Sequence, residues 1–71
     1  MTEYIIKKAI NEMKKIDIIY MKENGITERQ IKPIKLSDGI LEAYCYMRRS
    51  IRKFKMDNIL GASFIKHKNA G

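Results

Sequence analysis

The sequence has few of the residues that make cross-links, metal sites or membrane spans. One cysteine, Cys45, cannot form an internal disulfide, and one cysteine with one histidine, His67, cannot supply a zinc site of the usual spacing. No apolar run approaches the roughly 18 residues of a membrane-spanning helix. The N-terminus lacks the basic, apolar and small-residue regions of a secretory signal. These absences predict a cytoplasmic protein with no membrane association, no metal and no other cofactor.

Catalytic machinery is equally scarce. His67 has no second histidine with which to build a triad or an acid–base pair. Cys45 lies among apolar residues without a histidine partner, which is typical of a core thiol and not of a nucleophile. The four glycines do not have the spacing of a phosphate-binding loop. We therefore predict no catalytic residue and no enzyme activity.

What the sequence does contain is positive charge, and it is unevenly placed. The net charge is +7; residues 1–42 carry eight basic and seven acidic side chains, whereas residues 43–71 carry seven basic side chains and one acidic one. Five cations fall within eight residues that contain no acid: Arg48, Arg49, Arg52, Lys53 and Lys55. This density favours binding of a polyanion, although a solvated face that keeps the protein soluble is the alternative.

The length of 71 residues limits the chain to one domain. A chain this short buries only about 60% of the surface that its unfolded form exposes, so association with further copies would add stability. Apolar residues make up 45% of the chain, as in ordinary globular proteins. We expect a single folded domain over residues 1–71 that forms a homo-oligomer.

The N-terminal segment has the pattern of an amphipathic helix over residues 3–15. Thr2 can cap it, and its apolar residues recur at helical spacing: Ile6, Ala9, Ile10 and Met13. The apolar stripe is short and has no Trp or Phe anchor. A helix that covers one end of a barrel is therefore favoured over one that lies on a membrane.

From Ile16 onward the pattern is that of β-strands. Asn24-Gly25 offers two positive-φ residues for a tight turn, so strands 16–22 and 26–32 should pair as a hairpin, and Pro33 should mark a strand end or an edge. Further short strands are predicted over residues 34–36, 40–47, 51–57 and 62–66. One helix and about five antiparallel strands predict an α+β, mainly β, fold, with a small SH3-like or Sm-like barrel over residues 16–66.

Alternation along the later strands separates core from surface. In strand 40–47 one face is apolar, with Leu41, Ala43, Cys45 and Met47, and the other carries Glu42, Tyr44, Tyr46 and Arg48. In strand 51–57 the inward set is Phe54 and Met56, which places Arg52 at the rim of the inward face. An arginine there needs an anion or hydrogen bonds.

Residues 43–59 resemble a known family. Their sequence, AYCYMRRSIRKFKMDNI, is similar without a gap to the pattern A-Y-C-x-x-R-x-x-x-R-x-F-x-L-D-R-I of WYL domains. The segments around Ile16 and Pro33 fall in the expected order, as does the N-terminal helix. The Trp-Tyr-Leu triplet that names the family aligns with residues 39–41, where only Leu41 matches, and Asn58 replaces the Arg before the closing Ile.

The resemblance implies a fold and a function. WYL domains are Sm-like barrels that usually accompany helix-turn-helix transcription regulators, phage-defence proteins or CRISPR-associated proteins of bacteria and phages, where they are thought to sense nucleic acid or nucleotide-like ligands. This chain shows no helix-turn-helix segment, so it resembles the sensing module alone. The family's ligand positions correspond to Tyr20, Tyr44, Arg48 and Arg52, and Phe54 corresponds to the core. Residues 64–68 also faintly resemble the Y-K-H motif of the RNA chaperone Hfq.

Two functions remain open at this point. Arginine forks can clamp phosphate and tyrosine rings can stack on bases, so a site of Tyr20, Tyr44, Tyr46, Arg48 and Arg52 would bind single-stranded nucleic acid or a nucleotide-type anion. The alternative is a small homo-oligomeric interaction protein whose tyrosines and β edge contact and modulate a partner protein. Within the nucleic-acid-binding class, an Hfq-like RNA-binding Sm protein is also open.

Overall fold

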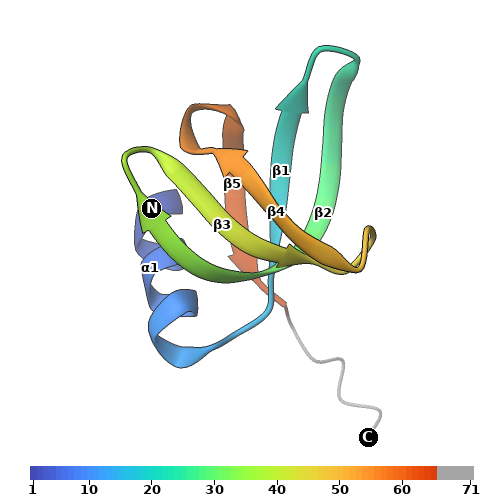
Figure 1. Ribbon diagram of the computed structural model, residues 1–71. Coiled ribbons are helices and arrows are strands. Elements are labelled where there is room, and N and C mark those ends of the chain that lie inside the picture. Colours follow the sequence, from blue (N-terminus) through green and yellow to red (C-terminus); the bar gives the residue numbers. More distant parts are fainter. Residues whose placement is uncertain (66–71) are drawn as a thin grey trace, which may run out of the picture.

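The computed structural model describes residues 1–65. One helix is followed by five strands and a short 3₁₀ turn: α1 (Thr2–Glu12), β1 (Ile16–Lys22), β2 (Gly25–Ser37), β3 (Ile40–Cys45), β4 (Ser50–Lys55), η1 (Met56–Asn58) and β5 (Ile59–Phe64). Figure 1 shows this order along the chain. The predicted α+β, mainly β, class is confirmed. No helix in residues 1–65 is long and apolar enough to cross a membrane.

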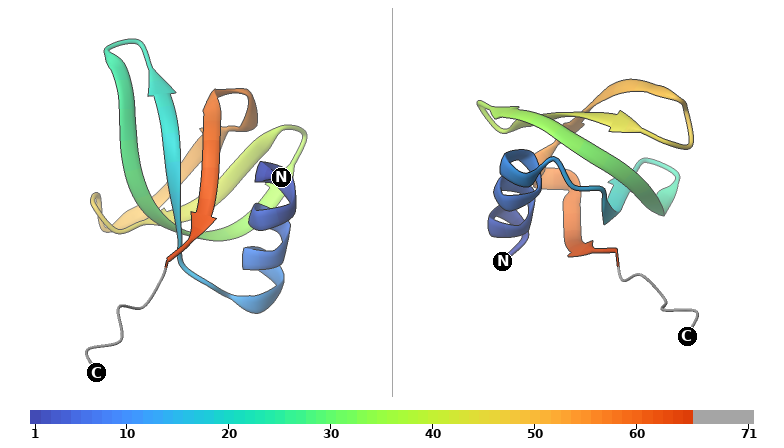
Figure 2. Two further views of the ribbon diagram at one scale, coloured as in Figure 1. Left: turned by 180° about the vertical axis from the view of Figure 1, so that it is seen from behind. Right: turned by 90° about the horizontal axis from the view of Figure 1, so that it is seen from below.

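The five strands form one antiparallel sheet in the order β4-β3-β2-β1-β5. The first half of the long strand β2 pairs with β1 and its second half pairs with β3, and Ile31 at the junction is opposite both Ile16 and Cys45. The sheet bends strongly along β2, so that β3 and β4 cross in front of β1 and β5 (Figures 1 and 2). Within residues 1–65 no ladder joins β4 to β5. The sheet therefore stays open, and the predicted barrel is not confirmed.

The gap between the sheet's edges has a local cause. β4 ends at Lys55, and η1 carries the chain away before β5 begins. At this end of β4 no neighbouring strand within residues 1–65 accepts the backbone N–H of Lys55. The Tyr20 hydroxyl accepts this N–H instead, at 3.1 Å. The Tyr20 ring also packs edge-to-face on Phe54, with centroids 5.1 Å apart. One tyrosine of β1 thus fixes where β4 lies.

The core lies on the inner side of this bend. Its buried apolar residues come from every α-helix and β-strand: Ile6, Ala9, Ile16, Ile18, Tyr20, Ile31, Leu41, Ala43, Cys45, Phe54 and Ile59. The predicted inward set of β3 is confirmed except for Met47, which is exposed because β3 ends at Cys45 and the chain turns through residues 46–49. α1 covers one end of the bent sheet through contacts with β2 and β5 (Figure 2).

The helix is shorter than its pattern predicts. Met1 is the N-cap and no side chain caps the helix, so the capping role predicted for Thr2 is wrong. At the other end Met13 adopts a left-handed conformation, with φ of 55°. The N–H of Lys14 donates to the carbonyl of Ala9 and that of Met13 to Ile10, which closes the helix in the manner of a Schellman motif. Met13 is exposed, not buried as predicted.

The strands also differ from prediction in detail. The first hairpin forms, but Lys22 pairs with Gly25, so Glu23 and Asn24 make the turn and only Gly25 has a positive φ, of 122°. The segments predicted at 26–32 and 34–36 are one strand, with an irregularity between Pro33 and Lys35. The last strand begins at Ile59, earlier than predicted. Residues 66–71, which include His67 and the end of the predicted last strand, lie outside the described part of the chain.

Candidate functional site

The inner side of the sheet contains a buried arginine. Arg29 lies on β2 opposite Ile18 and is only 6% exposed. Its Nε donates to Thr27 Oγ1 at 3.3 Å, and its Nη1 lies 4.0 Å from Cys45 Sγ. None of the ion pairs found within residues 1–65 includes Arg29. A cation at this depth therefore lacks the carboxylate that would ordinarily offset its loss of hydration.

The guanidinium of Arg29 keeps one donor group for a ligand. Every fully buried side-chain nitrogen or oxygen among the described residues has a hydrogen-bond partner. Nη2 of Arg29 has none within residues 1–65, so this nitrogen keeps some exposed surface there. The group is thus held through its stem and two of its nitrogens, while the third is open to an acceptor from outside.

Arg29 was not among the site residues predicted from the sequence. A signal was present, because Thr27, Arg29 and Ile31 share one face of β2, and Ile31 is fully buried. An arginine two residues before a core isoleucine on the same strand face is directed inward. Only the bend of β2, which brings β3 across that face, makes this position a buried one.

Arg52 lies on the same inner side. It pairs with Ala43, which is fully buried, so both side chains share the inward face of the β3–β4 hairpin, while Arg52 itself is exposed. This placement agrees with the rim position expected from the sequence. We use the term inner face for the surface around Arg29, Ala43, Cys45 and Arg52. Its two arginines belong to different strands, Arg29 to β2 and Arg52 to β4.

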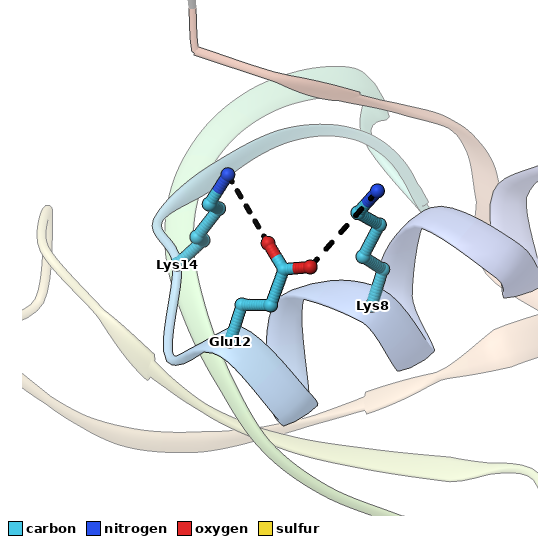
Figure 3. Close-up of polar contacts among 3 residues, drawn as sticks. All are labelled: Lys8, Glu12 and Lys14. Carbon is cyan, nitrogen blue, oxygen red and sulfur yellow. Dashed lines mark ion pairs between the residues drawn. The ribbon is translucent and has the colours of Figure 1, made fainter.

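The turn between β3 and β4 adds exposed positive charge. Arg48 and Arg49 lie in this turn, and Arg49 has a left-handed φ of 54°. No ion pair found in residues 1–65 includes a cation from residues 48–55. The cations of the helix region differ, since Glu12 pairs with Lys14 at 3.1 Å and with Lys8 at 3.9 Å (Figure 3). The unbalanced charge is therefore concentrated at the β3–β4 hairpin.

The pKa of the Cys45 thiol reflects the positive and hydrogen-bonding groups around it on the inner face. Burial raises the pKa of its thiol, but hydrogen bonds from the backbone N–H groups of Arg48 and Met47 and the nearby Arg29 guanidinium lower it further than burial raises it. The pKa of Cys45 therefore lies below its ordinary value. An anion at this position is stabilised by the groups around it, even though the thiol is buried.

The predicted tyrosines do not join the arginines. Tyr44 pairs with Ile51 and Lys32, so it lies on the side of the hairpin opposite to Arg52. The rings of Tyr44 and Tyr46 meet edge-to-face at 5.0 Å. Both line a groove of about 520 Å³ on the outside of the sheet, which we call the outer groove.

Tyr20 is mainly a core residue. It is 9% exposed, its ring packs on Phe54, and its hydroxyl is bonded to β4. It also lines two surface hollows, one beside β3 and β4 and the other beside the turn of the first hairpin. Of the five residues predicted for the site, the structure thus places Arg52 on the inner face, Arg48 in the adjoining turn, Tyr20 in the core against Phe54, and the other two tyrosines outside.

The donor set for a metal is not found. In the part of the chain that the structure describes, no three side chains of His, Cys, Asp or Glu lie together in a way that could hold a metal ion. The charged residues of the inner face, Arg29 and Arg52, are hydrogen-bond donors, and such groups are suited to an anion.

Comparisons with known proteins find a family and a solved structure that are similar to this chain. The model of the WYL domain family matches residues 4–64, nearly the whole chain. Among solved structures, the chain is similar to proteasome accessory factor B/C (PafBC) of Arthrobacter aurescens, with a TM-score of 0.80 and 24% sequence identity. The likeness covers 97% of this chain and 12% of that one, and it shows a shared fold. No curated protein matches the sequence.

Proposed function

Because this chain belongs to the WYL domain family, we propose that it is a regulatory module without catalytic activity that binds single-stranded nucleic acid or a nucleotide-type anion on its inner face. The family resemblance supports a place in transcription regulation. The observation that carries the proposal is Arg29, a cation 6% exposed that no carboxylate in residues 1–65 neutralises.

The chemistry of the inner face suits a phosphate group. The guanidinium of Arg29 is held in place by Thr27 and Cys45, so little conformational entropy is lost when its free nitrogen binds an oxygen. Arg52 and Arg48 are exposed and can approach the same ligand from the rim and the turn. Tyr20 contributes by fixing β4, and therefore Arg52, relative to β1.

The length of the ligand decides whether the other tyrosines take part. Tyr44 and Tyr46 lie on the far side of the hairpin from Arg52, with Arg48 in the turn between the two sides. A single nucleotide on the inner face would not reach them. A longer strand that passes around the turn would bring its phosphates to the hydroxyl groups of these tyrosines, and the five predicted residues together with Arg29 would then act on one ligand.

Titration of fluorescently labelled single-stranded DNA and RNA at two ionic strengths tests this proposal. We expect binding at low salt that weakens as salt is added, with a log–log slope of about −0.7 for each phosphate contact. Arg52→Ala should weaken binding by about 1.5 kcal/mol, roughly tenfold, and should make the salt slope shallower.

A matched control is Lys7→Ala, which removes the same charge from a lysine that Glu3 already neutralises at 2.9 Å. This variant should bind as the wild type does. Absence of binding at low salt, or equal losses from Lys7→Ala and Arg52→Ala, would show that the inner face is not an anion site.

Self-association and a cytoplasmic location stay predictions. Analytical ultracentrifugation of the pure protein tests the self-association.

A further inference from the structure

The outer groove is an aliphatic surface that nothing in residues 1–65 covers. It runs from the C-terminal end of α1 across the outside of β2, β3 and β4, and its aliphatic lining consists of Ile10, Met13, Pro33, Ile34 and Ile51. Three of these side chains are well exposed: Met13 at 71%, Ile51 at 58% and Ile34 at 44%. Contiguous apolar exposure of this kind on a small protein marks an interaction surface.

The groove does not have the form of a base-stacking site. Stacking needs a free aromatic face, but the ring of Tyr46 is packed against Tyr44 at one side and lies beneath Lys15 Nζ, 4.5 Å from the ring centroid. The rest of the apolar lining is aliphatic. Aliphatic walls, beside a Tyr46 ring that Tyr44 and Lys15 already contact, fit apolar protein side chains better than nucleobases.

The charged residues at the outer groove indicate the chemistry of its partner. Among residues 1–65, Lys32 is the one charged residue that lines the groove, and Lys15 lies at its rim over Tyr46. No carboxylate from the described residues lines it. A second copy would bring the same lysines and a net charge of +7 against each other, and pairing of two β4 edges would oppose Arg52 and Lys53 to their own counterparts. A complementary occupant carries negative charge.

We propose that the outer groove binds another protein, through a short segment of that protein that presents adjacent apolar side chains flanked by carboxylates. The apolar side chains fill the space between Ile34, Ile51 and the end of α1, and the carboxylates pair with Lys32 and Lys15. The site is separate from the anion site of the inner face, because the register places Ile51 and Arg52 on opposite sides of β4.

Nuclear magnetic resonance of the full isotope-labelled chain tests the proposal with two synthetic peptides. One is an amphipathic peptide of leucine and glutamate, and its twin has every glutamate replaced by lysine. The glutamate peptide should move the backbone signals of Ile34 and Ile51, and the lysine twin should not. Ile34→Asp and Lys32→Glu should each weaken the binding of the glutamate peptide by about tenfold or more.

Ile26→Asp is the matched control, because Ile26 is 64% exposed but lies beside the turn of the first hairpin and does not line the groove. It should leave the affinity for the peptide unchanged, as should Arg52→Ala, which affects only the inner face. The circular dichroism of each variant checks its fold, and Lys32→Glu, which changes a side chain at the surface, tests the groove even if Ile34→Asp is unstable.

Three results would overturn the proposal. Equal binding of the two peptides would remove the charge argument. A wild-type dimer that Ile34→Asp dissociates would make a second copy the occupant. Signals of Ile34 and Ile51 that respond to a single-stranded oligonucleotide, and not to the glutamate peptide, would assign the groove to nucleic acid.

Discussion

The two sides of the β3–β4 hairpin are built from alternate residues of the same strands, yet they differ in chemistry. The inner face has Arg52 of the hairpin and Arg29 of the neighbouring strand β2, both without carboxylate partners in residues 1–65, set beside small or buried residues such as Ala43 and Cys45. The outer groove has aliphatic residues and paired tyrosines. Strand alternation alone thus lets one hairpin offer an anion site and an apolar surface without the two competing for space.

The variant Arg29→Met tests the inner face with the largest expected effect. Methionine keeps the approximate length of the side chain and removes its charge, so oligonucleotide binding should weaken by about 2–3 kcal/mol, from roughly 30-fold to 150-fold. The free energy of unfolding should stay the same or rise, because a buried cation without a carboxylate partner is removed. Fluorescence titration and chemical denaturation measure the two quantities.

A different outcome would give Arg29 a purely structural role. If Arg29→Met unfolds more easily while its folded fraction binds the oligonucleotide as the wild type does, the guanidinium serves only to hold β2 against β3. Arg29→Lys is the comparison variant. It keeps the charge but loses the fork, and it should recover part of the affinity.

The variant Tyr20→Phe tests whether the Tyr20 hydroxyl holds β4, and with it one side of the inner face, in position. The change removes the acceptor of the Lys55 N–H bond and keeps the ring on Phe54, so it should lower the free energy of unfolding by about 1 kcal/mol. Faster amide hydrogen exchange at Lys55 should accompany this loss. Unaltered exchange at Lys55 would mean that the tyrosine hydroxyl does not hold the edge of the sheet.

Tyr46→Ala sharpens the boundary between the two sides. We expect no change in the affinity for a mononucleotide, and a loss of about 1 kcal/mol for an oligonucleotide long enough to pass around the turn, because the Tyr46 hydroxyl can donate a hydrogen bond to a phosphate there. Competition titrations with ligands of increasing length measure the difference. A loss that is equal for short and long ligands would place Tyr46 at the primary site and contradict the separation of the two faces.

The smallest effect is expected from the titration of Cys45. Because the pKa of its thiol is lower in the folded chain than its ordinary value of about 9.0, the thiolate stabilises the fold above that pH. This contribution is lost as the pH falls through the folded pKa. Relative to Cys45→Ala, the wild type should therefore gain stability with rising pH in this window. Arg29→Met should raise the pKa of the thiol, as followed by the ultraviolet absorbance of the thiolate.

Much of the fold could be predicted from sequence because its signals are local. Alternation identified Leu41, Ala43 and Cys45 as core, and the resemblance to WYL domains over residues 43–59 agrees with the family match over residues 4–64. Turn details were harder to predict. Asn24 does not take the positive φ that its type allows, since the pairing of Lys22 with Gly25 moves the turn by one residue.

The site was less predictable because it depends on the bend of the sheet. Pro33 suggested a strand end, but β2 continues through it, and this one long strand carries β3 across the inner face. Arg29 becomes buried only through that crossing. Tyr46 was assigned to the face of Tyr44 by alternation, yet β3 ends one residue earlier, and the two rings meet through the turn.

The most direct test of the inner-face site is to follow the side-chain Nε–H signal of Arg29 by nuclear magnetic resonance while a single-stranded oligonucleotide is added. Our account predicts that this signal shifts at the lowest ligand concentrations, together with the backbone signals of Arg52 and Cys45. An oligonucleotide that binds while the Arg29 signal stays in place, and the signals of Ile34 and Ile51 move instead, would contradict it.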